Sequence, residues 1–435
     1  MIPNDARQQT RIATVLSRFR SRFVVDIGLT FGSRILLLGV GLVTSMLTAK
    51  VLGPAGRGYF SVAMAIVALG AQFGNLGLHA SNAWVAGRRR DLVGALTANS
   101  FVVSAAFGML AFATAGALAI ANPRLLPLHG RLLFLALASV PVGLLYLLLQ
   151  NILVGLNEVK AYNAMEIVNR VSVMFALLLL AGVRDLTADS AVLVTLAGVV
   201  LATVLILGRL GPYSNGPWRP SRSVFDESFW YGCRAYTVAA LGFVVLRSDL
   251  FLVNQMLGPA QAGYYSIASA MADMLFLLPS AVGTVLFPKL LTFDQQARWP
   301  AVRSATTHMG AGMLLTIIGA IVLCRPAVQL LYGRAYLPAV APFIVLAVGA
   351  LFYGTNTPLS IYMASIGFPW LSIAAWGVAA FLNVGLNLYV IPAYGIMGAA
   401  ISSLICYAAI FFMHLLILRR ITRQPSAQLQ PSAAS

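Results

Sequence analysis

The stretch Leu257-Gly258-Pro259-Ala260-Gln261-Ala262-Gly263-Tyr264-Tyr265-Ser266 decides the fold, because the chain carries a second copy of it. The earlier copy is Leu52-Gly53-Pro54-Ala55-Gly56-Arg57-Gly58-Tyr59-Phe60-Ser61, and seven of the ten positions are identical at an offset of 205 residues. Each copy joins two long apolar runs through a Gly-Pro turn signal. The sequence therefore predicts an internal duplication, and the remaining predictions depend on it.

The composition excludes an ordinary soluble domain. Hydrophobic residues make up 60% of the chain and charged residues 9%, whereas a soluble domain is about 25% charged. A chain this apolar must lie in lipid, so the net charge of +17 indicates basic cytoplasmic loops and no nucleic-acid partner. The three cysteines, Cys233, Cys324 and Cys406, lie far apart in or beside apolar runs, so neither a disulfide framework nor a metal site is predicted.

Apolar runs of roughly 20 residues predict twelve membrane-spanning helices in an all-α integral membrane protein. The first six runs are 27–51, 59–86, 92–121, 130–154, 161–183 and 189–209, and the second six are 229–257, 263–291, 302–324, 338–364, 368–391 and 395–418. The predicted organisation is an N-terminal tail (1–25), a six-helix bundle (26–210), a linker (211–228), a second six-helix bundle (229–420) and a disordered C-terminal tail (421–435).

The distribution of lysine and arginine predicts the orientation in the membrane. With the N-terminus inside, the inside segments hold 18 of these residues and the outside segments hold 7. This bias places both termini and the linker in the cytoplasm, in agreement with an even number of spans. Because six helices separate the two copies, the two pseudo-symmetric bundles share one orientation and enclose a cavity that can open to either side.

Arginines inside the predicted spans indicate a wet interior, because an arginine at the bilayer centre costs at least about 2.5–3.5 kcal/mol. Arg34 and Arg170 are predicted at similar depths, roughly 12–14 Å from the inner surface at about 1.5 Å per residue. Both are candidate cavity residues. Arg170 also follows Glu166 by one helical turn, so an ion pair within the helix is expected and does not exclude a cavity role.

Arg247 and Asp273 are predicted to meet at one depth. Arg247 lies ten residues before the second linker and Asp273 lies ten residues after Gly263, so a hairpin folded at that linker brings them together. Asp249 is about 200° around the helix from Arg247 and is expected to face elsewhere, whereas Asn254 shares the face of Arg247. The pair is either a salt bridge between helices or an arginine held toward the cavity by its carboxylate.

The sequence carries no enzyme signature. A Walker motif, a dinucleotide-binding glycine fingerprint, an HExxH motif and a metal-spaced Cys/His cluster are all missing from the 435 residues. No predicted outside loop is long enough to form a catalytic domain. We therefore expect a protein that is not an enzyme, with no metal and no cofactor, and with Na⁺ or H⁺ left open as a coupling ion.

Several motifs are together similar to those of one family. They are the two Leu-Gly-Pro linkers, Arg247-Ser248-Asp249, the run 281–290, Leu-Tyr-Gly-Arg-Ala-Tyr at 331–336 and the run 387–400. On these residues the chain resembles, over about residues 26–418, the polysaccharide (O-antigen type) flippases. These form a branch of the multidrug/oligosaccharidyl-lipid/polysaccharide exporter superfamily.

The resemblance implies a multi-pass protein of the bacterial inner membrane. Such a flippase moves an undecaprenyl-diphosphate-linked oligosaccharide across the membrane by alternating access, in the synthesis of lipopolysaccharide O-antigen, capsule or exopolysaccharide. The resemblance implies that cavity arginines receive the diphosphate, and the candidates here are Arg34, Arg170 and Arg247, with Glu166, Asp249, Asp273 and Asn254 in coupling or supporting roles. The implied partners are the lipid-linked oligosaccharide, membrane lipids, a polysaccharide polymerase and a chain-length regulator.

Two other functions stay open from the sequence. A cation-coupled multidrug antiporter of the same superfamily would bind Na⁺ or protons at Asp249 and Asp273. Buried arginines argue against it, because they repel organic cations. A membrane-embedded glycosyltransferase or polymerase usually needs a sizeable outside loop, which the predicted topology does not provide.

Overall fold

The computed structural model describes residues 4–214, 218–292, 295–366 and 369–423, and the regular structure within these ranges is entirely helical. The N-terminal half contains α1 (Asn4–Gly74), α2 (Leu78–Arg88), η1 (Arg90–Leu92), α3 (Val93–Ala121), η2 (Pro123–Leu125), α4 (Gly130–Gly155), α5 (Val159–Gly182), α6 (Ala188–Leu210) and η3 (Gly211–Tyr213). The C-terminal half contains α7 (Arg222–Leu257), α8 (Pro259–Leu275), α9 (Leu277–Thr292), α10 (Gln295–Leu331), η4 (Arg334–Ala339), α11 (Val340–Ser365), α12 (Trp370–Tyr394) and α13 (Ile396–Arg423).

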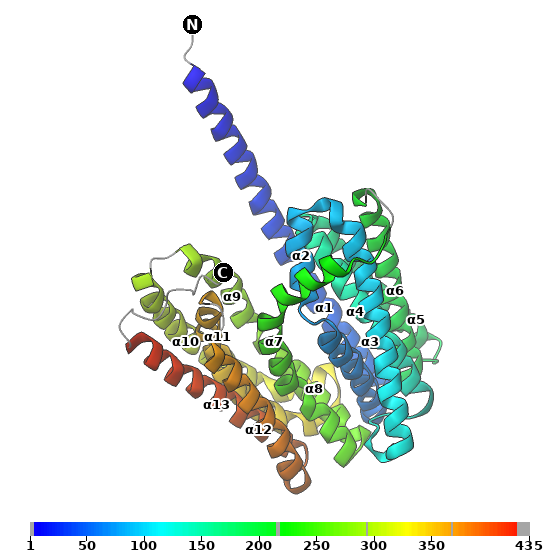
Figure 1. The fold of residues 1–435 in the computed structure, drawn as a ribbon. Coiled ribbons are helices and arrows are strands. Elements are labelled where there is room, and N and C mark those ends of the chain that lie inside the picture. Colours follow the sequence, from blue (N-terminus) through cyan, green and yellow to red (C-terminus); the bar gives the residue numbers. More distant parts are fainter. Residues whose placement is uncertain (1–3, 215–217, 293–294, 367–368, 424–435) are drawn as a thin grey trace.

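The helices form two bundles with α7 and α8 between them (Figure 1). The N-terminal bundle contains most of α1 together with α2–α6, and the C-terminal bundle contains α9–α13. The first part of α1 projects from the body, and α13 runs back toward the same end of the molecule (Figure 1). We call this the open end, and we call the opposite end, where the two Leu-Gly-Pro linkers lie, the linker end.

Eleven helical segments of the described chain are long and apolar enough to cross a membrane. The sequence predicts twelve, and the difference lies at Gly32–Gly74, which forms a single 43-residue segment. A straight helix of that length would be about 65 Å long, roughly twice the thickness of the hydrocarbon core. Gly53 interrupts this segment with non-helical backbone angles, φ 66° and ψ 178°.

Several helix boundaries differ from the predicted ones. The predicted helix 59–86 is divided at residues 75–77, where Leu76 and Gly77 have positive φ. The predicted helix 263–291 is divided at Phe276. Helix α7 begins at Arg222, inside the predicted linker 211–228, and α1 begins at Asn4, inside the predicted tail. Residues 424–435 of the tail predicted to be disordered lie outside the described residues.

The two copies of the linker adopt the same backbone conformation. Gly53 has φ 66° and ψ 178°, and Gly258 has φ 86° and ψ 175°. Side chains with a Cβ atom are strained at such positive φ values, so both positions require glycine. A proline follows each glycine at the first position of the next helix, where its missing N–H costs nothing. The duplication read from the sequence is therefore repeated in the backbone of the two turns.

The two linkers also pack directly against each other. A Cβ atom added to Gly58 would lie 1.8 Å from the carbonyl oxygen of Pro259, and one added to Gly263 would lie 1.9 Å from that of Pro54. No side chain fits at either position, because the obstacle is backbone. The two contacts are reciprocal, as a two-fold relation between the linkers requires. Glycines at a helix crossing allow membrane helices to approach this closely.

The apolar core is shared by the bundles at the linker end and separate at the open end. One large buried cluster joins Val62 of α1, Leu177 of α5, Tyr265 of α8 and Phe343 of α11. Toward the open end, the N-terminal bundle has its own cluster around Ile152. The C-terminal bundle has further clusters there, which contain no residue of α1–α6. The bundles are therefore held together at the linker end.

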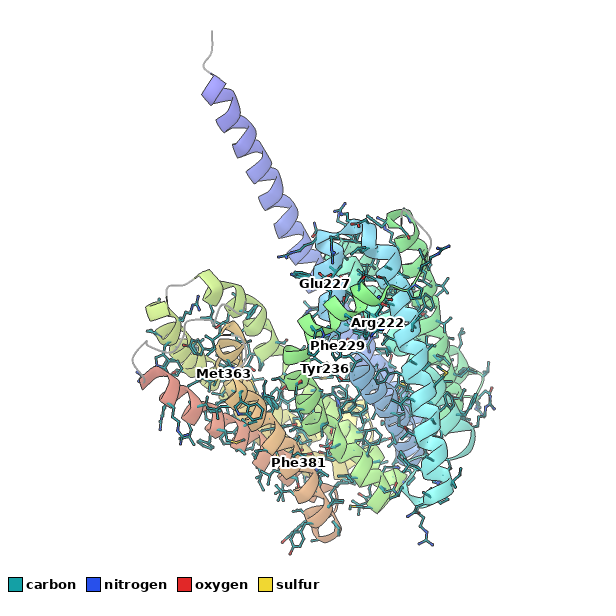
Figure 2. The ribbon with its side chains drawn as sticks, in the orientation of Figure 1. Arg222, Glu227, Phe229, Tyr236, Met363 and Phe381 are labelled. Atoms are coloured by element: carbon teal, nitrogen blue, oxygen red, sulfur yellow. The ribbon has the colours of Figure 1, made fainter. Side chains whose placement is uncertain are left out.

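Helix α7 has contacts with both bundles. Figure 2 labels Glu227 and Tyr236 on its first half, where they lie beside the N-terminal bundle. The Tyr236 hydroxyl donates to the carbonyl oxygens of Gln72 and Phe73 at 2.9 and 2.7 Å, and Glu227 pairs with Arg89. In its second half, Val245 packs in one cluster with Trp376 of α12, and Arg247 pairs with Asp273 of α8.

Candidate functional site

A cavity of about 310 Å³ lies between the bundles, where α1 faces α7 and α8. We call it the central cavity. Its walls are mostly apolar or small, with Phe60, Met64, Ala65 and Leu246 among the lining residues. Against this background it contains four ionisable side chains, which are Arg57, Arg247, Asp249 and Asp273.

Arg247 and Asp273 form an ion pair across the α7–α8 hairpin. The distance from Arg247 Nη2 to Asp273 Oδ2 is 2.8 Å, and the two side chains are 33% and 38% exposed. The hairpin turns at Gly258, so equal sequence distances from the linker bring both side chains to one depth, as predicted. The pair lines the central cavity and is therefore accessible to a ligand there.

Asp249 is buried beside this pair, with 3% of its surface exposed. Its carboxylate accepts hydrogen bonds from the Leu250 N–H at 2.8 Å, the Ser403 hydroxyl at 3.1 Å and the Tyr265 hydroxyl. These donors come from α7, α13 and α8. As expected, Asp249 forms its hydrogen bonds with groups other than Arg247. Its side chain nevertheless lines the same cavity as Arg247. Buried hydrogen bonds compensate its charge locally.

Arg57 is the cavity residue that the sequence analysis missed. The predicted topology puts it in an outside loop, whereas the structure buries it to 8% exposure in the first turn after Gly53. Its Nη1 donates to Thr48 Oγ1 at 2.5 Å and its Nη2 to Ser45 Oγ at 3.3 Å. Its Nε is buried with no hydrogen-bond acceptor in the described part of the chain. One feature of the sequence could have revealed Arg57. The two repeats differ at this position, which holds Arg57 in the first copy and Ala262 in the second.

Arg57 is also the cavity cation that lacks a carboxylate partner among the described residues. Arg247 is neutralised by Asp273, and Asp249 is satisfied by hydrogen-bond donors. Within the described part of the chain, the guanidinium of Arg57 contacts the hydroxyls of Thr48 and Ser45 and, at 5.7 Å, the ring of Phe60. A guanidinium with free donor capacity in a partly apolar cavity is suited to bind an anion.

Polar contacts between the bundles close the linker end. The Tyr336 hydroxyl donates to the carbonyl oxygen of Ala49 at 2.8 Å, and Ser45 and Tyr332 join their hydroxyls at 3.4 Å. Asn254 donates to the carbonyl oxygen of Pro127 at 2.7 Å, so this predicted supporting residue lies in the seal and not in the cavity. At the open end, the hydrogen bonds described between the bundles involve α7 and the segment that precedes it.

Arg34 and Arg170 do not line the central cavity. Arg170 is 60% exposed and pairs with Glu166 at 3.2 Å within α5, as its spacing predicts. Glu166 also accepts from Tyr146 at 2.9 Å and from Gln150 at 3.1 Å. Arg34 is exposed on α1 and lies near Tyr162 of α5. The structure therefore brings only Arg247 of the three predicted arginines into the cavity.

The described residues hold no group of three or more His, Cys, Asp or Glu side chains that could bind a metal ion. The two carboxylates of the cavity belong to separate networks, one with Arg247 and one with Tyr265 and Ser403.

Comparison with solved structures shows the fold. The chain superposes on an inward-facing multidrug resistance MATE family transporter of the MOP superfamily with a TM-score of 0.73, at 15% identity, over 91% of this chain and 96% of the other. It superposes on an inward closed conformation of the lipid II flippase MurJ with a TM-score of 0.72, at 16% identity, over 91% and 87% of the two chains. The architecture is therefore that of MOP-superfamily transporters.

Sequence relatives include two named membrane proteins. The "Probable low-salt glycan biosynthesis flippase Agl15" of Haloferax volcanii is 22% identical over 53% of this chain and 49% of its own length. The "EPS I polysaccharide export inner membrane protein EpsE" of Ralstonia nicotianae is 27% identical over 48% and 51%. The chain thus spans about half the length of these relatives.

The match to a protein family is broader. It covers residues 47–341, which is more than half of the chain and includes both linkers and the four ionisable residues of the central cavity. This multi-pass membrane chain therefore belongs to the family described as polysaccharide biosynthesis protein.

Proposed function

We propose that the protein is a flippase for an undecaprenyl-diphosphate-linked oligosaccharide in a bacterial inner membrane. The observation that carries the proposal is the buried, carboxylate-free guanidinium of Arg57 in a cavity between two bundles. The names of the relatives, a glycan biosynthesis flippase and a polysaccharide export protein, support a glycan substrate. The product is a surface polysaccharide such as O-antigen, capsule or exopolysaccharide.

The proposed topology has twelve crossings with both termini in the cytoplasm. The non-helical backbone at Gly53 supports counting the segment Gly32–Gly74 as two spans, which would turn the eleven candidate segments into twelve. The reciprocal packing of the linkers supports two pseudo-symmetric bundles of six. Since the positive-inside bias puts the chain termini in the cytoplasm, the open end faces the cytoplasm and the linker end faces the periplasm.

In the proposed mechanism the diphosphate enters from the open end and binds Arg57. A diphosphate offers several acceptor oxygens, and a guanidinium contacts two at once. A second contact forms with Arg247 as the anion competes with Asp273 for it. Arg34 and Arg170 are proposed as contacts outside the cavity. Transport then requires the seal of Ala49, Pro127 and Tyr336 to open while the open end closes.

The energy source and the assembly partners are part of the proposal. Asp273 is released from Arg247 when the diphosphate binds, so it is the proposed site at which H⁺ or Na⁺ couples to transport. Glu166 and Asp249 are proposed as supporting groups. A polysaccharide polymerase and a chain-length regulator are the proposed protein partners.

The second candidate function is a cation-coupled multidrug antiporter. The observation in its favour is that two carboxylates, Asp249 and Asp273, line the same cavity as the arginines. In that case the neutral substitutions Asp249→Asn and Asp273→Asn would abolish drug efflux, whereas Arg57→Gln would leave it intact.

The experiment that tests the proposed function uses proteoliposomes with a fluorescent undecaprenyl-diphosphate oligosaccharide. Arg57→Gln and Arg247→Gln are expected to slow translocation by about tenfold or more, since a hydrogen bond to a charged group contributes about 1.5–3 kcal/mol. Arg57→Lys should retain part of the activity, and Arg325→Gln, an exposed arginine at the linker end, should retain all of it. Unchanged translocation in both cavity variants, or ethidium efflux by the wild type, would refute the proposal.

A further inference from the structure

A second cavity of about 290 Å³ lies within the C-terminal bundle, between the open ends of α10, α11 and α13. It is lined by Trp299, Arg303, Thr306, Thr307, Leu359, Leu415 and Arg419. None of these residues belongs to α1–α8, so this cavity is separate from the central one. We call it the inner-rim cavity.

Among the described residues, the charges that line the inner-rim cavity are all positive. Its lining contains two guanidiniums and no carboxylate. Among the described residues neither Arg303 nor Arg419 forms an ion pair. Both are exposed, so their donors are free to meet a ligand at the surface. Chemically, the cavity is therefore suited to an anion with several acceptor oxygens.

The hydroxyls of the two threonines that line the cavity are not available as donors to a ligand. Thr306 donates to the carbonyl oxygen of Val302 at 2.8 Å, and Thr307 donates to that of Arg303 at 3.1 Å. Their hydrogens are already used within α10. The remaining donors are the guanidiniums and the indole N–H of Trp299.

The apolar part of the cavity identifies the kind of anion. Leu359 is 1% exposed and belongs to the buried cluster beneath the cavity, against which Leu415 also packs. The residues lie near the starts or ends of their helices, at the level where membrane helices meet the lipid headgroups, and Trp299 is typical of that level. A free phosphate would contact only the two arginines. A lipid would contact the arginines through its phosphate and the apolar residues Leu359 and Leu415 through its hydrocarbon part.

We propose that the inner-rim cavity binds the phosphate headgroup of an anionic phospholipid from the cytoplasmic leaflet. The two arginines contact the phosphate oxygens, and the glycerol and upper acyl carbons lie over Leu359 and Leu415. Basic pockets between membrane helices on the cytoplasmic side are a recurrent site for such lipids. The lipid would tie α10, α11 and α13 together at the end of the molecule where the bundles are separate.

The test uses the purified full chain in a neutral detergent, titrated with phosphatidylglycerol, phosphatidylcholine or inorganic phosphate. Binding is followed by the melting temperature and by native mass spectrometry. Phosphatidylglycerol is expected to raise the melting temperature and to remain bound. Arg303→Gln with Arg419→Gln should weaken its apparent affinity by about 25-fold, since each basic residue near the surface contributes about fivefold.

The matched control is Arg325→Gln with Arg334→Gln, two exposed arginines of the same bundle at the linker end, which should change nothing. The double lysine variant, Arg303→Lys with Arg419→Lys, should retain most of the affinity. If the double glutamine variant does not fold, each single variant must lose about fivefold. Equal affinity in variants and wild type overturns the proposal. So does a melting shift reproduced by inorganic phosphate alone, or by phosphatidylcholine.

Discussion

At the scale of single residues, the hydroxyl of Tyr265 matters because it donates to a buried carboxylate. Replacing Tyr265 by phenylalanine leaves Asp249 with the Leu250 N–H and Ser403 as donors. We expect the free energy of unfolding to fall by about 1.5–3 kcal/mol, the usual contribution of a hydrogen bond to a charged group. Thermal unfolding in detergent measures this. Tyr264→Phe is the control, because the Tyr264 hydroxyl has no hydrogen bond among the described residues and its loss should cost less than about 0.5 kcal/mol.

A second residue-scale prediction concerns Glu158, in the loop between α4 and α5. The hydrogen bond from the Tyr213 hydroxyl lowers the pKa of the Glu158 carboxyl most, and the hydrogen bond from the Arg209 guanidinium lowers it further. Together they hold this pKa below its usual value. A lowered folded-state pKa stabilises the fold above the unfolded-state pKa, and this contribution is lost as the pH falls through the folded-state pKa.

Glu158→Gln should therefore lower the melting temperature at neutral pH, and the difference from wild type should shrink as the pH is taken below about 4. Melting curves at a series of pH values provide the measurement. Asp91→Asn serves as the comparison, since Asp91 is exposed and has no ion pair in the described chain. A difference that persists in acid would show that the hydrogen bonds to Glu158 are not responsible.

Some residues of the site were predictable from the sequence and others were not. The Arg247–Asp273 pair was predictable, because two helices joined by a tight turn place equal distances from that turn at equal depth. The position of Arg57 was not, because the predicted loop around Gly53 left no helical turn for it. The bonds of Asp249 to Ser403 join residues 154 positions apart, and no local pattern contains that information.

At the scale of elements, the crossing of α1 and α8 depends on two glycines. A methyl group at Gly58 or Gly263 would overlap the backbone of the other linker, and neither backbone can move away without separating the helices. Gly58→Ala and Gly263→Ala should each destabilise the protein by about 1–3 kcal/mol, as overpacking does. The two variants should behave alike, because the contact is reciprocal.

Gly116→Ala in α3 is the control, since nothing lies within 4 Å of the added atom. It should stabilise the protein by up to about 1 kcal/mol through helix propensity. Thermal unfolding of the three variants measures these changes in stability. A Gly58→Ala variant as stable as the wild type would contradict the described packing.

Helix existence was predictable from apolar runs, but helix ends were not. The runs around α3, α4 and α6 agree with the structure to within one residue at each end. The break at Phe276 was missed because it lies within continuous apolar sequence, whereas the break at residues 75–77 was missed because the turn residues Asn75 and Gly77 were taken as part of one apolar run. Positive φ at Leu76 has no signature in residue type, since leucine rarely adopts it.

At the scale of the whole molecule, the closed linker end predicts one-sided access to the central cavity. Ser269 lines that cavity, and Ala335 is exposed in η4 at the linker end. In a variant without the native cysteines, Ser269→Cys should react with a charged, impermeant thiol reagent in inside-out vesicles and stay protected in right-side-out vesicles. Ala335→Cys should show the opposite pattern. Labelling of Ser269→Cys from the periplasmic side alone would reverse the proposed orientation.

The sequence predicted two like-oriented bundles but not which end is closed. The duplication and the basic loops are visible in the chain, whereas the seal depends on pairs such as Tyr336 with Ala49, which are 287 residues apart.

One consequence follows from the way in which α7 is anchored. A Cβ atom at Gly77 would lie 2.7 Å from the Gly232 backbone, and one at Gly232 would lie 2.6 Å from that of Gly77, so the start of α7 is clamped to α2. Its far half carries Arg247 into the cavity beside the other bundle. Any swing of the C-terminal bundle must then bend this one rod between its two anchors. Bending of α7 between these two anchors is therefore the expected cost of moving one bundle relative to the other.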